Sequence, residues 1–373
     1  MTKIMLLKDR NNFNTKWVCN FASQLTIRGY EVVLVADSYS HAGEPVAIDE
    51  RVKKLNLSAK TSNPFYNLWL CLRNFLPLAH IRYKKLFAEE NPDIIICYFN
   101  HDLINATLRQ THNIPIIMMM HNPPNEIFAN VRRGFRRFAT DKAFARANVV
   151  QVLMNSFKKE VTDIYPNKTV EVIPNQVIIP KDCCDLSVTK NTIIHVAQIA
   201  EQFKRQHLLI EAFAKIADDF PTWKVLFFGK VKKGKHKKYF KRLQKRVKEL
   251  NLQDRLIFKG YSNNITQEYL NSDIVTMPSF SEGFGYGLAD GLAIGLPGVG
   301  FASAPAINEL IIDGKTGFLV KDIDDYAAKL AKLMSDKALR VQMGKQARQD
   351  MERYSPQSVI DKWVNLIEKT LKK

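Results

Sequence analysis

The sequence has no apolar run long enough to cross a membrane, and it has few cysteines. No window reaches the roughly 18–20 consecutive apolar residues of a membrane-spanning helix. The opening residues, MTKIMLLKD, contain too short an apolar run for a signal peptide and instead predict a first strand. The five cysteines lack the spacing of metal or redox sites and are typical of a reducing cytoplasm: Cys19, Cys71, Cys97, Cys183 and Cys184.

Acidic residues are scarce relative to basic ones. The 37 Asp and Glu residues are outnumbered by 55 Lys and Arg, so the formal net charge is +18. Such a charge indicates an anionic partner, which could be nucleic acid, an anionic bilayer or phosphorylated small molecules. Basic and aromatic residues interleave in 65–87, 131–138 and 230–248. These stretches either form solvated faces or, as we expect, bind an anionic membrane surface. No nucleic-acid module accompanies the charge, so nucleic acid is not the expected partner.

Short apolar runs alternate with helical patterns along the whole chain. A stretch rich in proline and polar residues, 173–191, separates two series of these runs and predicts a linker. Continuous apolar runs are typical of parallel strands buried on both faces. The predicted strands are 3–7, 31–37, 93–99, 114–120, 149–154, 169–173, 192–198, 224–229, 255–260, 273–278 and 317–320. Both halves are therefore expected to be α/β units with parallel sheets, which bind ligands beyond the carboxyl ends of their strands.

The segment SFSEGFGYGLADGLAIGLP, residues 279–297, joins a glycine-containing loop to a helix predicted over 285–295. Because it follows a predicted strand, the free N–H groups and positive dipole end of this helix suit a phosphate. Asp290 lies about five residues into the helix, roughly 8 Å along its axis at ~1.5 Å per residue. This offset matches the one between the diphosphate and the ribose of a nucleotide.

Two acidic side chains and three spaced glycines flank this helix start. Glu282 can accept hydrogen bonds from hydroxyls beyond the phosphates, and Asp290 from the ribose hydroxyls. Glycines at 287, 291 and 295 are expected to leave a smooth face that lets a ligand or backbone approach. We therefore expect the segment to bind a nucleotide diphosphate sugar. The alternative is that the glycines only let the helix pack closely on a strand and that the carboxylates are solvated.

The same segment resembles the signature of a known family. Glu282 and Asp290 are separated by seven residues, and the surrounding P-S-x-S-E-G-F-G and G-L-P resemble the E-x7-E signature of retaining GT-B glycosyltransferases of family 4. Further segments resemble that family in the expected order: IRGYEVVLV, FNHDLINATL, IPIIMMMHN, VEVIPNQV, VAQIAEQFKRQHLLIEAFAKI, LQDRLIFKGY and NELIIDGKTGFLV. Individually these patterns are loose, but their order and spacing are specific.

The resemblance implies an α/β fold of the GT-B type, with two Rossmann-like domains facing across a cleft. Residues 1–178 would form an N-terminal acceptor-binding domain, and residues 179–355 a C-terminal nucleotide-sugar-binding domain. A C-terminal helix in 356–373 would cross back and pack on the N-terminal domain.

The resemblance also implies roles for single residues. Glu282 would bind hydroxyls of the donor sugar, Lys204 would hold the diphosphate and stabilise the departing charge, and His121 would line the sugar pocket. Further donor-binding candidates are Gln198, Arg205, Ser281, Gly283, Phe284, Gly285, Tyr286 and Asp290. The acceptor candidates are Arg10, Asn12, His101 and Asp102. The alternatives are a structural His121, and a His101–Asp102 pair that caps a helix over 102–110.

Two positions depart from the family's pattern. Gln198 stands where the family usually has an arginine six residues before the lysine, and Arg205 is expected to compensate. The first loop, KDRNNFN (8–14), has no glycine, although its asparagines tolerate left-handed backbone conformations. Both departures bear on the acceptor class and on activity.

The implied reaction moves a sugar, with retention of configuration, from a nucleotide diphosphate donor, most simply UDP-linked. No metal ion or other cofactor is expected, and the leaving phosphate would accept the proton of the nucleophile. The expected acceptor is a glycan or lipid-linked molecule in polysaccharide or lipopolysaccharide synthesis, used by a cytoplasmic enzyme bound peripherally to the inner face of the membrane. The alternatives are a glycosyl phosphorylase or hydrolase, and a non-catalytic membrane-bound scaffold of the same fold.

Overall fold

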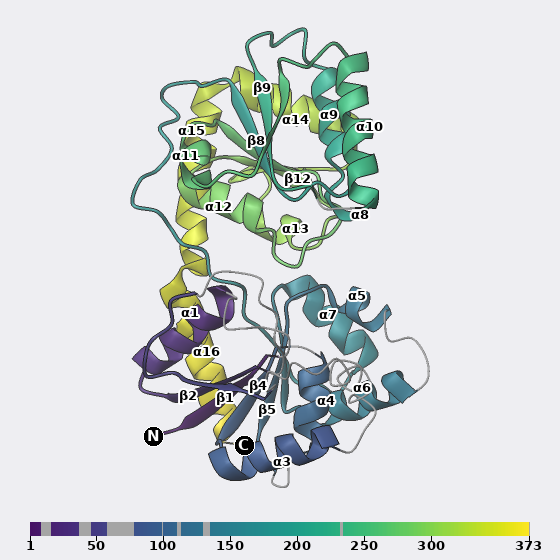
Figure 1. Cartoon of the computed structure of the whole chain (residues 1–373). Helices are drawn as coiled ribbons and strands as arrows, with labels where there is room; N and C mark the ends of the chain where they lie inside the picture. Colours follow the sequence, from purple (N-terminus) through teal and green to yellow (C-terminus); the bar gives the residue numbers. More distant parts are fainter. Residues whose placement is uncertain are drawn as a thin grey trace. The chain divides into compact units, whose positions relative to one another are not determined.

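The computed structural model describes residues 1–8, 16–36, 46–57, 78–98, 100–109, 113–129, 135–231 and 234–372. The chain forms two compact units, each built on its own parallel sheet (Figure 1). The N-terminal unit comprises Met1–Leu153, Phe157–Ile173 and Ile360–Lys373. The C-terminal unit comprises Met154–Ser156 and Pro174–Val359.

The N-terminal unit contains a seven-stranded parallel sheet in the order β3-β2-β1-β4-β5-β6-β7. Its strands are β1 (Lys3–Leu7), β2 (Glu31–Ala36), β3 (Lys53–Asn56), β4 (Ile94–Cys97), β5 (Ile116–Met120), β6 (Val149–Val152) and β7 (Val170–Val172). The central strands read IIIC and IIMMM, and every one of these side chains is buried. The continuous apolar runs in the sequence therefore mark strands covered on both faces.

Helices connect these parallel strands. They are α1 (Lys16–Ile27), α3 (Leu78–Glu90), α4 (Asn100–Arg109), α5 (Pro124–Ala129), α6 (Phe135–Arg146) and α7 (Asn155–Ile164). The last helix, α16 (Pro356–Leu371), ends in this unit. Its buried Trp363 lies 4.9 Å from the Phe21 ring of α1, and Arg28 pairs with Asp361 at 2.5 Å. The C-terminal helix thus packs on the N-terminal unit, as the family resemblance implies.

The C-terminal unit contains a six-stranded parallel sheet in the order β10-β9-β8-β11-β12-β13. Its strands are β8 (Thr192–Val196), β9 (Lys224–Phe228), β10 (Leu256–Gly260), β11 (Ile274–Met277), β12 (Gly298–Phe301) and β13 (Gly317–Val320). Its helices are α8 (Glu201–Lys204), α9 (Gln206–Ala214), α10 (Lys235–Glu249), α11 (Ile265–Leu270), α12 (Tyr286–Ile294), α13 (Ile307–Leu310), α14 (Ile323–Ser335), α15 (Lys337–Met351) and the 3₁₀ turn η2 (Glu352–Tyr354).

Two strands have no counterpart in the sequence prediction. β3 reads KKLN and lies at the edge of its sheet, where exposed charged residues replace an apolar run. β12 reads GVGF, and glycine is a poor strand former by propensity. A Cβ at Gly300 would lie 2.4 Å from the Ile307 side chain, so close packing of α13 on β12 requires glycine there. Both strands escaped prediction because packing, rather than local pattern, determines them.

Two other expectations concern helices. Of the basic and aromatic stretch 65–87, which we expect to be helical, residues 65–77 fall outside the described residues and 78–87 belong to α3. Among the helices that the model does describe, none combines the length and apolar character needed to span a bilayer.

Candidate active site

The helix predicted to meet a phosphate is α12, which follows β11 and a short loop. Its N-cap residue is Gly285, with φ of 90°, a left-handed conformation that favours glycine, and this residue makes no side-chain cap. The positive dipole end of α12 therefore carries no capping side chain at Gly285, and an anionic ligand could approach it. Gly295 ends the helix with φ of 98°.

Gly287 and Gly291 of α12 face the sheet, so strand atoms rather than a ligand approach these two glycines closely. A Cβ at Gly287 would lie 1.9 Å from the Val196 carbonyl oxygen of β8. A Cβ at Gly291 would lie 2.6 Å from the Val275 side chain of β11. This agrees with the alternative given above, in which the glycines let the helix pack closely: here α12 packs directly on the two strands β8 and β11. This packing fixes the helix start relative to the sheet edge.

Glu282 and Lys204, predicted separately from the sequence, form one ion pair. The Nζ atom of Lys204 lies 2.5 Å from each carboxylate oxygen of Glu282. The buried Ser279 hydroxyl donates to Glu282 Oε1 at 2.6 Å. Only 9% of Glu282 is exposed, whereas 23% of the Lys204 side chain is exposed. A carboxylate and an ammonium are thus oriented beside the start of α12.

The loop that carries Glu282 is bound to the α8–α9 connection. The Phe280 amide donates to the Phe203 carbonyl at 2.7 Å. Arg205, between these two helices, has φ of 47°, and its guanidinium lies 4.3 Å from the centre of the Phe280 ring. A left-handed non-glycine residue is strained, and such residues often cluster at functional sites. The strained Arg205 and its stacking on Phe280 therefore both lie next to Lys204.

Buried polar side chains, those of His195 and Gln206, also bind near the α8–α9 connection. His195 of β8 is fully buried, and its Nδ1 lies 3.0 Å from the Thr276 carbonyl. Burial lowers the pKa of His195 to about 4, so the ring is neutral near pH 7. The Gln206 amide lies 3.4 Å from the other ring nitrogen and donates to the Gln198 carbonyl at 2.9 Å. The side chain of Gln198 itself is exposed.

Asp290 lies in α12 and is half-buried. Burial raises the pKa of its carboxyl to about 6. No hydrogen bond joins this carboxylate to another described residue, although the buried Tyr269 beside it donates to the Gly287 carbonyl at 2.7 Å. Asp290 thus keeps a partly accessible carboxylate with free acceptor capacity on the helix predicted to hold a ribose.

Replacing Asp290 by asparagine should stabilise the fold at neutral pH. Because the folded pKa is about 6 and the usual value is 3.8, the wild type loses stability as the pH rises from about 4 to about 6. The amide of Asp290→Asn does not titrate, so the melting temperature of this variant should exceed the wild-type value at pH 7.5. Below about pH 4 the wild-type carboxyl is protonated as well, so this difference in melting temperature should disappear. Thermal unfolding across this range measures both. Asp254→Asn, at an exposed site, is the control, and parallel pH profiles for Asp290→Asn and wild type would contradict the assignment.

The remaining donor candidates lie around the same helix start. Phe284 is buried, with ring centroids 5.1 Å from Tyr286 and 5.6 Å from Tyr354. Tyr286 is exposed, and Ser281 and Gly283 are partly exposed. Phe284 therefore anchors the loop in the core, while Ser281, Gly283 and Tyr286 remain accessible to solvent.

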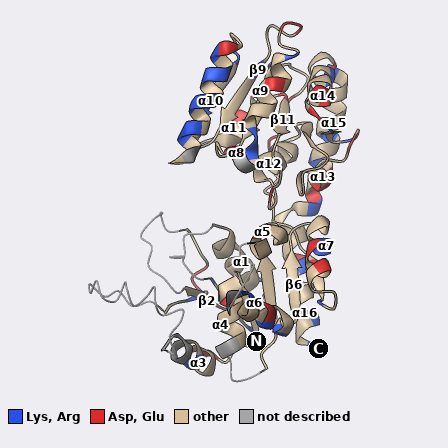
Figure 2. Cartoon of the chain, turned by 90° about the vertical axis from the view of Figure 1, so that its right-hand side faces the viewer, with Lys and Arg blue, Asp and Glu red and all other residues tan. Residues whose placement is uncertain are grey.

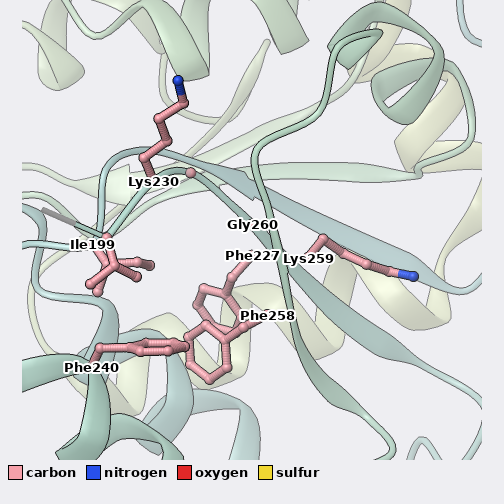
Figure 3. Close-up of a pocket in the computed structure, with 9 residues that line it drawn as sticks. Ile199, Phe227, Lys230, Phe240, Phe258, Lys259 and Gly260 are labelled. Carbon is pink, nitrogen blue, oxygen red and sulfur yellow. The ribbon is translucent and has the colours of Figure 1, made fainter. Parts of the chain in front are cut away.

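A pocket that the sequence analysis missed lies at the carboxyl ends of β9 and β10. It has a volume of about 470 Å³ and is lined by Ile199, Phe227, Gly229, Lys230, Val231, Phe240, Phe258, Lys259 and Gly260. Figure 3 shows the three phenylalanine rings gathered together, with the two lysines extending away from them. A phenylalanine followed closely by a glycine stands at the end of both strands, in FFG (227–229) and FKG (258–260), and this was the available signal.

The candidates in the N-terminal unit lie at the carboxyl ends of its strands. His121 follows β5 and stacks on Tyr98, which follows β4, with ring centroids 4.3 Å apart. Asp102 is buried in the first turn of α4, and His101 Nε2 lies 3.5 Å from its Oδ1 atom. Arg10 and Asn12 lie outside the described residues. Among the residues that are described, no group of three or more His, Cys, Asp or Glu could hold a metal ion.

Two family models match successive parts of the chain. Residues 15–179 match the model described as Glycosyltransferase Family 4, and residues 185–350 match Glycosyl transferases group 1. Together they cover most of both units.

Individual known proteins are similar to this chain over most of its length. N-acetyl-alpha-D-glucosaminyl L-malate synthase of Bacillus anthracis is 26% identical over 91% of this chain and 89% of its own. Poly(ribitol-phosphate) alpha-N-acetylglucosaminyltransferase of Staphylococcus aureus (strain COL) is 23% identical over 79% of this chain and 59% of its own. The structure of Anabaena HepE in complex with UDP-glucose superposes with a TM-score of 0.72, at 18% identity, over 99% of this chain and 100% of its own. Fold, family models and relatives agree: the chain is a glycosyltransferase and belongs to family 4 of the GT-B type.

Proposed function

We propose that this glycosyltransferase moves a sugar from a nucleotide diphosphate sugar, with UDP as the nucleotide, to a glycan or lipid-linked acceptor. The observation that carries the proposal is the Lys204–Glu282 ion pair beside the start of α12, where the N-cap residue is a glycine. This pair puts a cation and an anion next to the positive dipole end of a helix, at the carboxyl edge of a parallel sheet. Nucleotides bind at this edge in open α/β sheets.

Each part of the donor has a matching group in the C-terminal unit. The diphosphate would lie against the start of α12, with Lys204 as its counter-charge. Glu282 would accept hydrogen bonds from the sugar hydroxyls, and Asp290 from the ribose hydroxyls. The base would enter the pocket at β9 and β10, where the rings of Phe240 and Phe258 offer apolar surface. Ile199 lines that pocket shortly before α8 delivers Lys204, so the subsites follow one another along the sheet edge.

The proposed reaction proceeds with retention of configuration. As the bond between the sugar and the diphosphate breaks, negative charge develops on the leaving phosphate, and Lys204 stabilises it. The acceptor hydroxyl attacks from the same face, and its proton passes to the leaving phosphate oxygen. The protein supplies position and charge, and no metal ion is invoked. Proton NMR of the product anomer tests retention.

The proposed donor and acceptor classes draw support from the relatives. The HepE structure holds UDP-glucose, and the two similar enzymes are named for transfer of N-acetylglucosamine to malate and to a poly(ribitol-phosphate) polymer. The corresponding acceptor for this chain would belong to the synthesis of a cell-surface polysaccharide or of lipopolysaccharide. A net charge of +18 suits acceptors that are anionic or lie at an anionic surface.

We further propose that α10 binds the anionic inner face of the membrane. Tyr239, Leu243 and Val247 form its buried face, and the opposite face is basic along its length (Figure 2). Arg242 and Arg246 are paired with Glu201 and Glu211. Four further exposed lysines form no ion pair with a described residue: Lys237, Lys238, Lys241 and Lys248. These four lysines, named here the α10 lysine face, can approach lipid phosphates.

Reversing two charges of the α10 lysine face should weaken association with anionic vesicles at least tenfold. Each basic residue near such a surface contributes about 1 kcal/mol, and Lys237→Glu with Lys241→Glu also adds repulsion. Sedimentation with phosphatidylserine-containing vesicles measures the change. Lys337→Glu with Lys345→Glu on α15 changes the net charge equally and serves as the control. Equal binding by both double variants would remove the α10 lysine face from the proposal.

A further inference from the structure

A tyrosine of α10 caps the helix that begins just after Lys204. Lys204 ends α8, Arg205 forms the connection, and α9 begins at Gln206. Arg205 is the N-cap residue of α9 and makes no side-chain cap. The first N–H groups of a helix have no partner within it and take one from elsewhere. Here the backbone N–H of His207 donates to the Tyr239 hydroxyl at 3.1 Å, so α10 supplies the cap.

The same hydroxyl makes a second bond, to the ring of His207. The Tyr239 hydroxyl oxygen lies 3.0 Å from Nδ1 of His207, and the two rings are nearly perpendicular, at 86°. Burial lowers the pKa of His207 and raises the pKa of Tyr239 to about 12, so near pH 7 the ring is neutral and the hydroxyl keeps its proton. The hydroxyl thus accepts from the backbone of His207 and donates to its ring. Only 3% of Tyr239 is exposed, so water does not easily replace either bond.

Tyr239 lies on the side of α10 that contacts α8 and α9 (Figure 1). Arg242 pairs with Glu201 of α8, and Arg246 pairs with Glu211 of α9. The three α10 residues are three and four positions apart, which places them on one side of the helix. Both arginine side chains are exposed, and exposed ion pairs contribute little to stability. The buried Tyr239 hydroxyl is therefore the contact with the larger expected effect.

Two further hydrogen bonds hold the segment that carries Lys204. The Gln206 side chain donates to the Gln198 carbonyl at 2.9 Å, which joins α9 to the residues after β8. The Phe280 amide donates to the Phe203 carbonyl at 2.7 Å, which joins α8 to the loop before α12. The α8–α9 connection is thus bound to two neighbouring loops and, through one hydroxyl, to α10.

We propose that Tyr239 is a positioning residue for the transferase reaction: its hydroxyl caps α9 and so holds Lys204 in place for the donor diphosphate. Tyr239 acts through the α8–α9 connection rather than by contact with the donor. A charge that stabilises a leaving phosphate must be oriented before the reaction, and a small misplacement is costly. This inference rests on the proposed role of Lys204 and adds a residue from another helix to it.

The hydroxyl can be removed while the ring stays. Tyr239→Phe should weaken UDP binding, measured calorimetrically, about three- to tenfold, which is the factor expected from the loss of about one neutral hydrogen bond. Tyr165→Phe is the matched control, because it removes a hydroxyl that donates to Asp141 at 2.6 Å in the N-terminal unit. Arg246→Ala is a second control on α10 itself. Both controls should bind UDP as the wild type does, and wild-type affinity in Tyr239→Phe would overturn the inference.

The same substitution in a Lys204→Ala background separates positioning from a general loss of structure. If Tyr239 acts through Lys204, Tyr239→Phe should weaken UDP no further once Lys204 is absent. A hydroxyl needed only for the structure of the unit would weaken UDP by the same factor in both backgrounds. Equal factors in the two backgrounds would therefore contradict the positioning role.

Hydrogen exchange of the unliganded protein reports the cap without any donor. Tyr239→Phe should speed amide exchange in residues 201–208, whereas Tyr165→Phe should leave exchange there as in the wild type. Unchanged exchange of this segment in Tyr239→Phe would overturn the inference. Absence of UDP binding to the wild type would contradict the proposed function together with this inference, whereas unchanged UDP affinity in Tyr239→Phe would contradict the inference alone.

Discussion

Lys204→Ala is expected to lower turnover at least tenfold, and toward a hundredfold, with UDP-sugar donors. The Nζ atom of Lys204 is held by both oxygens of Glu282 beside the start of α12, so its charge is oriented before the donor arrives. Removing one preorganised group that stabilises developing negative charge typically costs about 10²–10³ in turnover. Initial rates of UDP release, measured at saturating donor, report the loss.

The control for this variant must separate charge from stability. Lys204→Ala leaves the nearly buried Glu282 without its cation, so its melting temperature should fall. Adding Glu282→Ala should restore part of the melting temperature without restoring turnover. Lys215→Ala, at an exposed lysine just beyond α9, should leave turnover unchanged. Near-normal rates in a folded Lys204→Ala enzyme would refute the role assigned to Lys204.

Glu282→Gln is the second substitution with a large expected effect. The amide keeps the size of the side chain and can still accept from Ser279, now 2.6 Å from Oε1 of Glu282, but it loses the negative charge. We expect turnover to fall at least tenfold, because sites built to bind a hydroxyl lose much of their transition-state binding when one acceptor is removed. The affinity for UDP, which has no sugar, should change little.

The comparison between UDP and UDP-sugar makes this prediction specific. If Glu282 contacts the sugar, Glu282→Gln should weaken UDP-glucose or another accepted UDP-sugar while UDP binds as in the wild type. Equal weakening of UDP and UDP-sugar would place Glu282 at the diphosphate instead. Unchanged turnover would remove it from the site.

The sequence predicted the fold well where burial alone shapes a strand. Runs such as IIIC in β4 and IIMMM in β5 are apolar at every position because both faces of these strands are covered. The edge strand β3, KKLN, has one partner and keeps its charges, so its pattern does not distinguish it from a loop. Local pattern therefore predicts central strands better than edge strands.

The candidate site was predicted in part, and its errors have a physical cause. The four-residue spacing of Gly287 and Gly291 places them on one face of α12, but spacing cannot tell whether that face meets a ligand or a sheet. The pairing of Lys204 with Glu282 joins residues far apart in the chain, and only the order of strands brings them together. For the same reason the sequence analysis identified His121 but not Tyr98, whose ring stacks on it.

Titration of the protein with UDP, by calorimetry, tests most directly whether the start of α12 and Lys204 form a nucleotide diphosphate site. The account predicts that wild-type protein binds UDP, that Lys204→Ala binds it at least tenfold more weakly, and that Lys215→Ala binds it as the wild type does. Absence of UDP binding to the wild type, or equal UDP affinity in Lys204→Ala, would contradict it.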